Sequence, residues 1–211
     1  LPPLSRADAQ TAARAKLLAF RDEVDADPGY RQAGYLWLSA DAREQAILRE
    51  GLAVQHAEGL SEAREVTAAE VRQLNPALAP EGIFGGVYCP TDGFIHPRGI
   101  LDGYLGSALR RGAHVRWGST VLAFERADDG AITGVVTDRG TIHTELVVDA
   151  AGAWAGHVAA MAGVVLPVEP LRRQVAATIP CDLLPAGMPM TIYAGDGYHL
   201  RVRDGRVLLL W

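Results

Sequence analysis

Hydrophobic and polar positions follow two different spacings along the chain, and the changes between them mark the expected elements. Five segments combine helix-favouring residues with a helical spacing or a helix start signal: about 5–24, 41–56, 68–75, 97–111 and 154–161. Either Ser39 or Asp41 suits the N-cap of the second segment, and Thr67 with Glu70 forms a capping-box pattern before the third. We therefore expect five helices, most of them in the first half of the chain.

Strands are predicted where β-branched and aromatic residues gather between turn signals. The segments are 34–38, 82–89, 121–126, 131–137, 141–149, 171–178, 190–194, 198–203 and 207–211. Tight turns at 128–130 and 138–140 predict a three-stranded meander, and Asp204 with Gly205 turns the last pair. The run 146–150 is apolar enough to predict a strand buried on both faces.

The order of these elements predicts two interleaved units and a mixed α/β and α+β fold. One unit holds the helix, the meander and the buried strand of about 90–165, and the other is built from the segments on either side. A length of 211 residues leaves room for this arrangement, and 49% hydrophobic residues exclude a disordered chain.

Charge, cysteine content and hydropathy exclude other classes of protein. A net charge of −5 argues against a nucleic-acid binder, which would present a basic face. Two cysteines, Cys89 and Cys181, build neither a disulfide framework nor a metal-site spacing, so we expect no metal. No apolar run approaches the ~20 residues of a membrane-spanning helix.

One segment, 147–156, carries the strongest signal for a ligand. A strand ends there in three very small residues, Ala150, Ala151 and Gly152, which leave room for close approach to the backbone. A helix follows directly, and free amides at a helix start favour anionic groups. Close helix–strand packing at a βα turn explains the same pattern, and the residues alone leave both interpretations open. The chain contains no Gly-x-Gly-x-x-Gly.

An ordered series of motifs resembles the D-amino acid oxidase superfamily of FAD-dependent oxidoreductases. Residues 147–154, Val-Val-Asp-Ala-Ala-Gly-Ala-Trp, resemble its second flavin-contacting motif, and 92–97, Asp-Gly-Phe-Ile-His-Pro, resemble its Asp-Gly-x-x-x-Pro helix entry. Residues 30–38, 111–115 and 166–175 resemble further family segments in the same order. The nearest branch is similar to sarcosine oxidase β-subunits and glycine oxidases.

The resemblance implies a fold, a cofactor and a set of contacts. It implies a substrate-binding domain with a mixed β-sheet, from 1–89 and 166–211, whose first helix borders the FAD domain. Residues 90–165 would be the central part of a Rossmann-like FAD-binding domain. The implied FAD contacts are the Val121 backbone and the residues of the small-residue motif and its tryptophan: Ala150, Ala151, Gly152 and Trp154.

For the substrate, a small amine or amino acid, the resemblance points to Tyr198, with Arg201 as a second candidate. Strand alternation places Tyr198 and Leu200 on one face and His199 and Arg201 on the other. Tyr198 and Arg201 should therefore not line the same pocket unless a bulge intervenes. No catalytic residue is assigned.

The resemblance also implies that this is an internal piece of a longer flavoenzyme. The dinucleotide-binding glycines would precede Leu1, and the segment covering the flavin would follow Trp211, so we expect this piece alone to bind FAD weakly or not at all. With no signal peptide recognised, the expected location is the cytoplasm. Oligomers or partner subunits stay open.

Two other functions are consistent with the same sequence. A related flavoprotein of the L-2-hydroxyglutarate oxidase type would oxidise a 2-hydroxy acid on the same scaffold. A binding or assembly module without catalysis would use the substrate-domain sheet as an interface, for which the aromatic strand Tyr35–Leu38 is the candidate.

Overall fold

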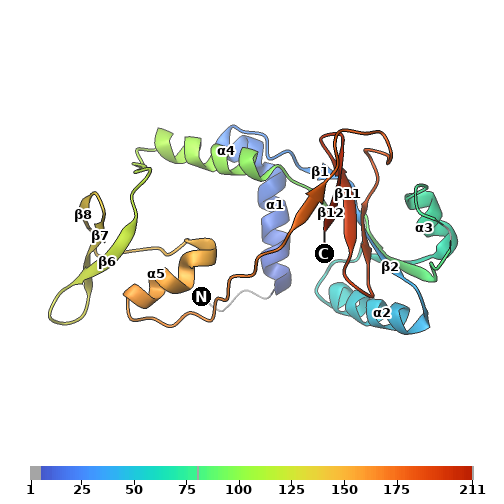
Figure 1. Cartoon of the computed structure of the whole chain (residues 1–211), viewed down its shortest axis with the longest axis horizontal. Coiled ribbons are helices and arrows are strands. Elements are labelled where there is room, and N and C mark those ends of the chain that lie inside the picture. Colours follow the sequence, from blue (N-terminus) through green and yellow to red (C-terminus); the bar gives the residue numbers. More distant parts are fainter. Residues whose placement is uncertain (1–5, 80, 211) are drawn as a thin grey trace. The chain divides into compact units, whose positions relative to one another are not determined.

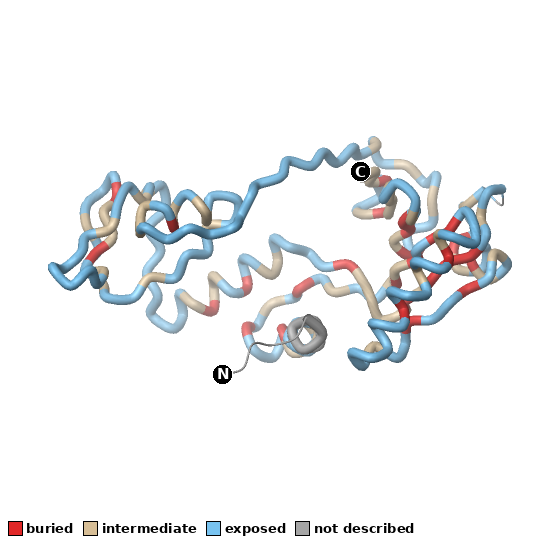
Figure 2. The backbone as a smooth tube through the Cα atoms, turned by 90° about the horizontal axis from the view of Figure 1, so that it is seen from below, coloured by how far each residue is buried: buried red, intermediate tan, exposed pale blue. Residues whose placement is uncertain are grey.

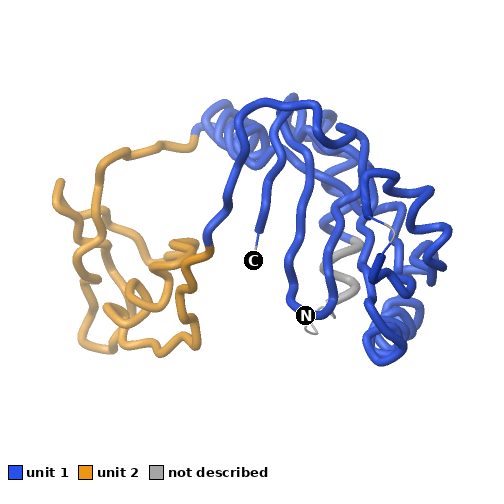
Figure 3. The backbone as a smooth tube through the Cα atoms, turned by 45° about the vertical axis from the view of Figure 1, so that its right-hand side comes forward, with its two compact units in different colours: residues 1–112, 174–211 blue, residues 113–173 orange. Residues whose placement is uncertain are grey.

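The computed structural model describes residues 6–79 and 81–210, which divide into two compact units. Unit 1 comprises the described residues up to Gly112 together with those from Gln174 onward, and unit 2 is Ala113–Arg173 (Figure 3). Unit 2 is therefore inserted between two parts of unit 1.

Unit 1 contains four helices and most of the strands (Figure 1). The helices are α1 (Arg6–Val24), α2 (Ala42–Ala57), α3 (Ala68–Leu74) and α4 (Pro97–Arg110). The strands are β1 (Arg31–Gln32), β2 (Tyr35–Ser39), β3 (Arg64–Thr67), β4 (Gly85–Cys89), β5 (Gly93–Phe94), β9 (Val175–Ala177), β10 (Met190–Tyr193), β11 (His199–Arg203) and β12 (Arg206–Leu210). The predicted mixed α/β and α+β class is confirmed, and the four helices of this unit end within two residues of their predicted bounds.

Seven of these strands form one mixed sheet with the order β3-β4-β2-β10-β11-β12-β9. β2 and β10 are parallel, and all other neighbours are antiparallel. β1 and β5 form a separate two-stranded ribbon. The predicted turn between β11 and β12 is confirmed: Asp204 and Gly205 have φ of 51° and 68°, as a two-residue hairpin loop requires.

The two faces of this sheet pack against different elements. On one face, Leu36 and Leu38 of β2 pack with Val66 of β3 and Val71 of α3. On the other, Val87 and Cys89 of β4 pack with Leu52 of α2. In a third cluster, Met188 from the segment before β10 packs against Val202 of β11 and Val207 of β12. Figure 2 shows that the buried residues concentrate in and beside this sheet.

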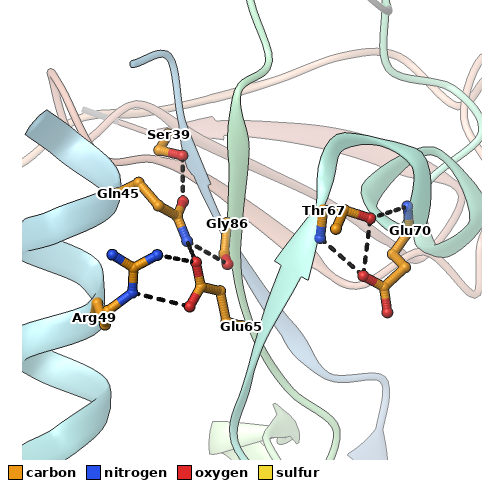
Figure 4. Close-up of polar contacts among 7 residues, drawn as sticks. All are labelled: Ser39, Gln45, Arg49, Glu65, Thr67, Glu70 and Gly86. Atoms are coloured by element: carbon orange, nitrogen blue, oxygen red, sulfur yellow. Dashed lines mark hydrogen bonds and ion pairs between the residues drawn. The ribbon is translucent and has the colours of Figure 1, made fainter. Parts of the chain in front are cut away.

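A buried amide joins α2 to three strands of the sheet (Figure 4). Gln45 accepts a hydrogen bond from the Ser39 hydroxyl and donates to the Gly86 carbonyl at 3.2 Å and to Glu65 at 2.9 Å. Arg49 pairs with the same carboxylate at 3.0 Å. These hydrogen bonds, first that of Arg49 and then that of Gln45, lower the pKa of Glu65.

The helix caps follow their sequence signals. Asp41 is the N-cap of α2, accepting from the Glu44 amide at 2.8 Å, so Ser39 is free to bind Gln45 instead. Thr67 and Glu70 form the predicted capping box before α3 (Figure 4). The Thr67 amide and hydroxyl, and then Arg64, lower the pKa of Glu70 to about 2.

Unit 2 consists of the predicted meander and a short helical segment. The meander is β6 (Val121–Arg126), β7 (Ile132–Thr137) and β8 (Gly140–His143), and the helical part is a 3-10 turn, Gly152–Trp154, followed by α5 (Ala155–Met161). Unit 2 is described throughout, and its only buried residues are Gly134, Thr137 and Ala159 (Figure 2).

The prediction of a buried strand at 146–150 is wrong for this structure. The third strand ends at His143, and Leu146 and Val148 are each 81% exposed. A strand needs a neighbour for its backbone hydrogen bonds, and no described strand pairs with this segment. The apolar composition of this segment indicated burial, but it did not indicate which neighbouring strand would pair with it. Similarly, only Val175–Ala177 of the predicted strand 171–178 forms a strand.

Candidate functional site

The small-residue motif of unit 2 forms a short, exposed turn. Asp149 accepts a hydrogen bond from the Ala151 amide at 3.0 Å, and the Trp154 amide donates to the Ala151 carbonyl at 3.0 Å. Gly152 has φ of 57°, and among the described residues no atom outside its immediate chain neighbours lies within 4 Å of the position a Cβ would take. The Ala151 amide is thus already bound, and the backbone around Gly152 is open.

Most side chains around this turn are exposed. Ala150 and Gly152 are exposed, Trp154 is 71% exposed, and Leu146 and Val148 leave an apolar surface before them. Exposed apolar residues in one stretch mark a surface that is covered by something else. Nothing in the turn blocks the close approach that the small residues allow, so the residues present are compatible with a dinucleotide.

Val121 opens β6 and is partly buried. It lies opposite Thr137 of β7, and the register shifts by one residue between Val121 and Ala123. The preceding residue, Thr120, makes two hydrogen bonds to Asp138. Its amide donates to the Asp138 carboxylate at 2.9 Å, and its carbonyl accepts from the Asp138 amide at 3.1 Å. This pair holds the start of the strand in place.

Tyr198 and Arg201, the two predicted substrate contacts, lie on opposite faces of the unit 1 sheet. The Tyr198 carbonyl accepts a hydrogen bond from Tyr193, and the two rings are 5.8 Å apart. Tyr193 lies beside Leu38, on the face that packs against α3. Arg201 follows with no register shift in β11 and therefore points to the other face. The alternation predicted from the sequence is confirmed.

The Arg201 face carries an aromatic contact that the sequence analysis missed. The Arg201 guanidinium lies 5.3 Å from the centre of the Phe94 ring, and that of Arg31 lies 5.4 Å from the same centre. Tyr35 completes the group, with its ring 6.4 Å from that of Phe94. Burial raises the pKa of Tyr35, and the positive charge of Arg201 opposes that effect.

A 440 Å³ pocket opens beside this group. Its lining includes Arg31, Phe94, His96 and Arg201. The His96 ring accepts a hydrogen bond from the Gly99 amide at 3.2 Å and so caps α4. The pattern Asp-Gly-Phe-Ile-His-Pro did mark this place in the sequence, but Arg31 and Arg201 reach it from elsewhere in the chain.

The face that bears Tyr198 has a smaller hollow of 260 Å³ beside Tyr193. Glu44 and Asp196 contribute carboxylates to its lining. Burial, followed by the neighbouring Tyr198 and Asp196, raises the pKa of Tyr193. Among the residues that the structure describes, no cluster of three or more His, Cys, Asp or Glu side chains could hold a metal ion.

The chain belongs to the FAD-dependent oxidoreductase family, whose model (DAO, "FAD dependent oxidoreductase") matches residues 2–210. FAD is therefore the cofactor of the family to which these two units belong. No helix in the described residues is long and apolar enough to cross a membrane.

Curated and solved relatives agree with this assignment. The chain is 29% identical over 161 residues to mitochondrial sarcosine dehydrogenase of Mus musculus, covering 74% of this chain and 17% of that protein. The structure of L-proline dehydrogenase from P. horikoshii matches 97% of this chain with a TM-score of 0.86 at 25% identity. Glycine oxidase from Geobacillus kaustophilus matches 99% with a TM-score of 0.81 at 25% identity. The chain spans 55% of each of these two structures.

Proposed function

We propose that the whole protein is an FAD-dependent enzyme that oxidises the C–N bond of a small amine or amino acid. The observation that carries this proposal is the family match over residues 2–210, joined to relatives whose names are sarcosine dehydrogenase and glycine oxidase. The chemistry supplied by bound FAD is acceptance of a hydride from the carbon next to nitrogen, after which water hydrolyses the imine product.

In this proposal unit 2 contributes the FAD contacts. The backbone at Ala150, Ala151 and Gly152 lets the cofactor approach closely, and the exposed Trp154 ring covers part of it. Val121 contributes its backbone at the start of β6. The exposed apolar side chains of Leu146 and Val148 support the same role, because they would be covered in a larger flavin-binding domain.

Unit 1 supplies the substrate-binding sheet in this proposal, and Tyr198 is the proposed contact. Its ring packs against Tyr193, which holds it at the start of β11. We place the substrate-binding domain at 1–89 and 166–211 and the central FAD region at 90–165. Helix α4 lies in the proposed FAD region by sequence but belongs to unit 1, where it contacts α1.

The test is purification of the whole protein followed by anaerobic mixing with candidate substrates. We expect a yellow protein whose flavin absorbance is bleached by sarcosine, glycine or a D-amino acid, with release of ammonia, an amine or formaldehyde. Bleaching by 2-hydroxy acids alone, with a 2-oxo acid as product, would replace the proposal by a hydroxy-acid oxidase. A colourless protein that takes up no FAD would favour the binding-module alternative.

A further inference from the structure

The pocket beside Phe94 contains two arginines that pair with no acidic side chain among the described residues. Arg31 lies directly opposite Phe94 in the β1–β5 ribbon, and Arg201 reaches the same ring from β11. The other charges of the pocket are already paired: Asp27 with Arg21 at 2.8 Å and Asp204 with Arg203 at 3.5 Å. In the described part of the chain, neither Arg31 nor Arg201 forms an ion pair.

The Arg201 side chain is also short of hydrogen-bond acceptors. Its Nε atom is buried and donates to no described residue. A buried donor without an acceptor is unfavourable, and for a charged group the cost is larger than for a neutral one.

We propose that this pocket, which we call the Phe94 pocket, binds a small organic carboxylate. The guanidiniums of Arg31 and Arg201 would supply the positive charge and planar donors that suit a carboxylate, and the Phe94 ring would contact the carbon skeleton. A volume of 440 Å³ lies within the range of small-molecule sites. Because Arg201 and Tyr198 point to opposite faces of the sheet, this site is separate from the proposed Tyr198 contact.

The first experiment measures binding of succinate to the whole protein by calorimetry, with succinamide as the neutral analogue. We expect saturable succinate binding that weakens at least tenfold in Arg201→Gln and in Arg31→Gln. Arg98→Gln is the matched control, because it removes one positive charge from an exposed pair with Asp102 outside the pocket. Its affinity for succinate should stay within twofold of the unmodified protein.

Arg201→Lys keeps the charge and removes the planar donor pair, so it should fall between the unmodified protein and Arg201→Gln. Thermal unfolding of each variant identifies any that fail to fold, and Arg201→Lys and Arg31→Gln then keep the test available. The proposal is overturned if succinate does not saturate, if succinamide binds equally well, or if Arg98→Gln loses binding as Arg201→Gln does.

Steady-state kinetics tests whether the carboxylate ligand is the substrate, which would place substrate binding here instead of at Tyr198, or a separate ligand. If it belongs to the substrate, succinate competes with substrate and Arg201→Gln raises KM with little change in kcat. If it is a separate ligand, succinate does not compete and KM is unchanged. The flavin content of the unmodified protein tests the proposed function independently, since succinate binding to unit 1 does not require FAD.

Discussion

Asn75, the C-cap residue of α3, donates a hydrogen bond to the Thr191 hydroxyl in β10 at 2.9 Å, and both side chains are completely buried. The two residues are 116 positions apart in the chain. The Asn75 side-chain oxygen, Oδ1, also accepts from the Ala77 amide at 3.2 Å, so this one side chain ends the helix and fixes it to the centre of the sheet.

We therefore expect Asn75→Ala to lower the free energy of unfolding by about 1–3 kcal/mol, the usual cost of leaving a buried polar group without its partner. Urea unfolding provides the measurement. The control is a double-mutant cycle with Thr191→Val: the double variant should lose less than the sum of the two single losses. Strict additivity would contradict the coupling described here.

Glu70 should make the stability of the protein depend on pH in a defined window. Its pKa falls from 4.5 to about 2 on folding, so its ionised form is favoured by the folded state. This stabilisation is fully present above pH 4.5 and is lost as the pH falls toward 2. Unfolding measured across that window should show a shallower pH dependence in Glu70→Gln. An identical slope in both proteins would show that the capping box does not act in this way.

Two glycine-to-alanine substitutions should have opposite effects on stability. At Gly86 an added Cβ would lie 2.1 Å from the Trp37 carbonyl oxygen of the neighbouring strand, so Gly86→Ala should cost about 3 kcal/mol through overpacking. At Gly51, inside α2, an added Cβ would have no described atom within 4 Å beyond its chain neighbours and the backbone of its own helix, and Gly51→Ala should stabilise by about 0.5–1 kcal/mol because alanine favours a helix. Thermal unfolding measures both, and a stable Gly86→Ala variant would contradict the close β2–β4 pairing.

Two tryptophans of unit 2 provide a matched pair for testing the proposed FAD contact. Trp154 and Trp117 are each 71% exposed. We expect Trp154→Ala to weaken FAD binding by the whole protein about tenfold, the equivalent of roughly 1.4 kcal/mol. Trp117→Ala should leave FAD binding unchanged. FAD titration by fluorescence quenching measures both, and equal losses would remove Trp154 from the proposed site.

The elements that sequence predicted best are those defined by local signals. Helix starts are marked by short motifs, Asp41 for α2 and the Thr67–Glu70 capping box for α3. The hairpin loop between β11 and β12 is specified by Asp204 and Gly205. Strand β3 was missed because its four residues include a single buried apolar one, Val66. It forms a strand because its backbone pairs with β4, which its composition does not indicate.

Features set by distant parts of the chain were beyond a local pattern. Alternation correctly separated Tyr198 from Arg201, because it needs only the spacing within one strand. The meeting of Arg31, Phe94 and Arg201 depends on a ribbon lying against a strand more than 100 residues later, which no local spacing encodes. The prediction of a strand at 146–150 was wrong for a related reason. Its apolar composition is typical of a strand, but a strand forms only where a neighbour pairs with it, and no described strand does so here.

The parallel pair β2 and β10 imposes an order on the synthesis of this protein. Residues 35–38 are made before unit 2, yet their partners at 190–193 follow only after all of unit 2 has been made. During that interval one edge of β2 has no partner, although β4 can already pair with the other. The nascent chain must therefore keep this strand edge away from other polypeptides until residues 190–193 have been made, which makes it a candidate for chaperone protection during that interval.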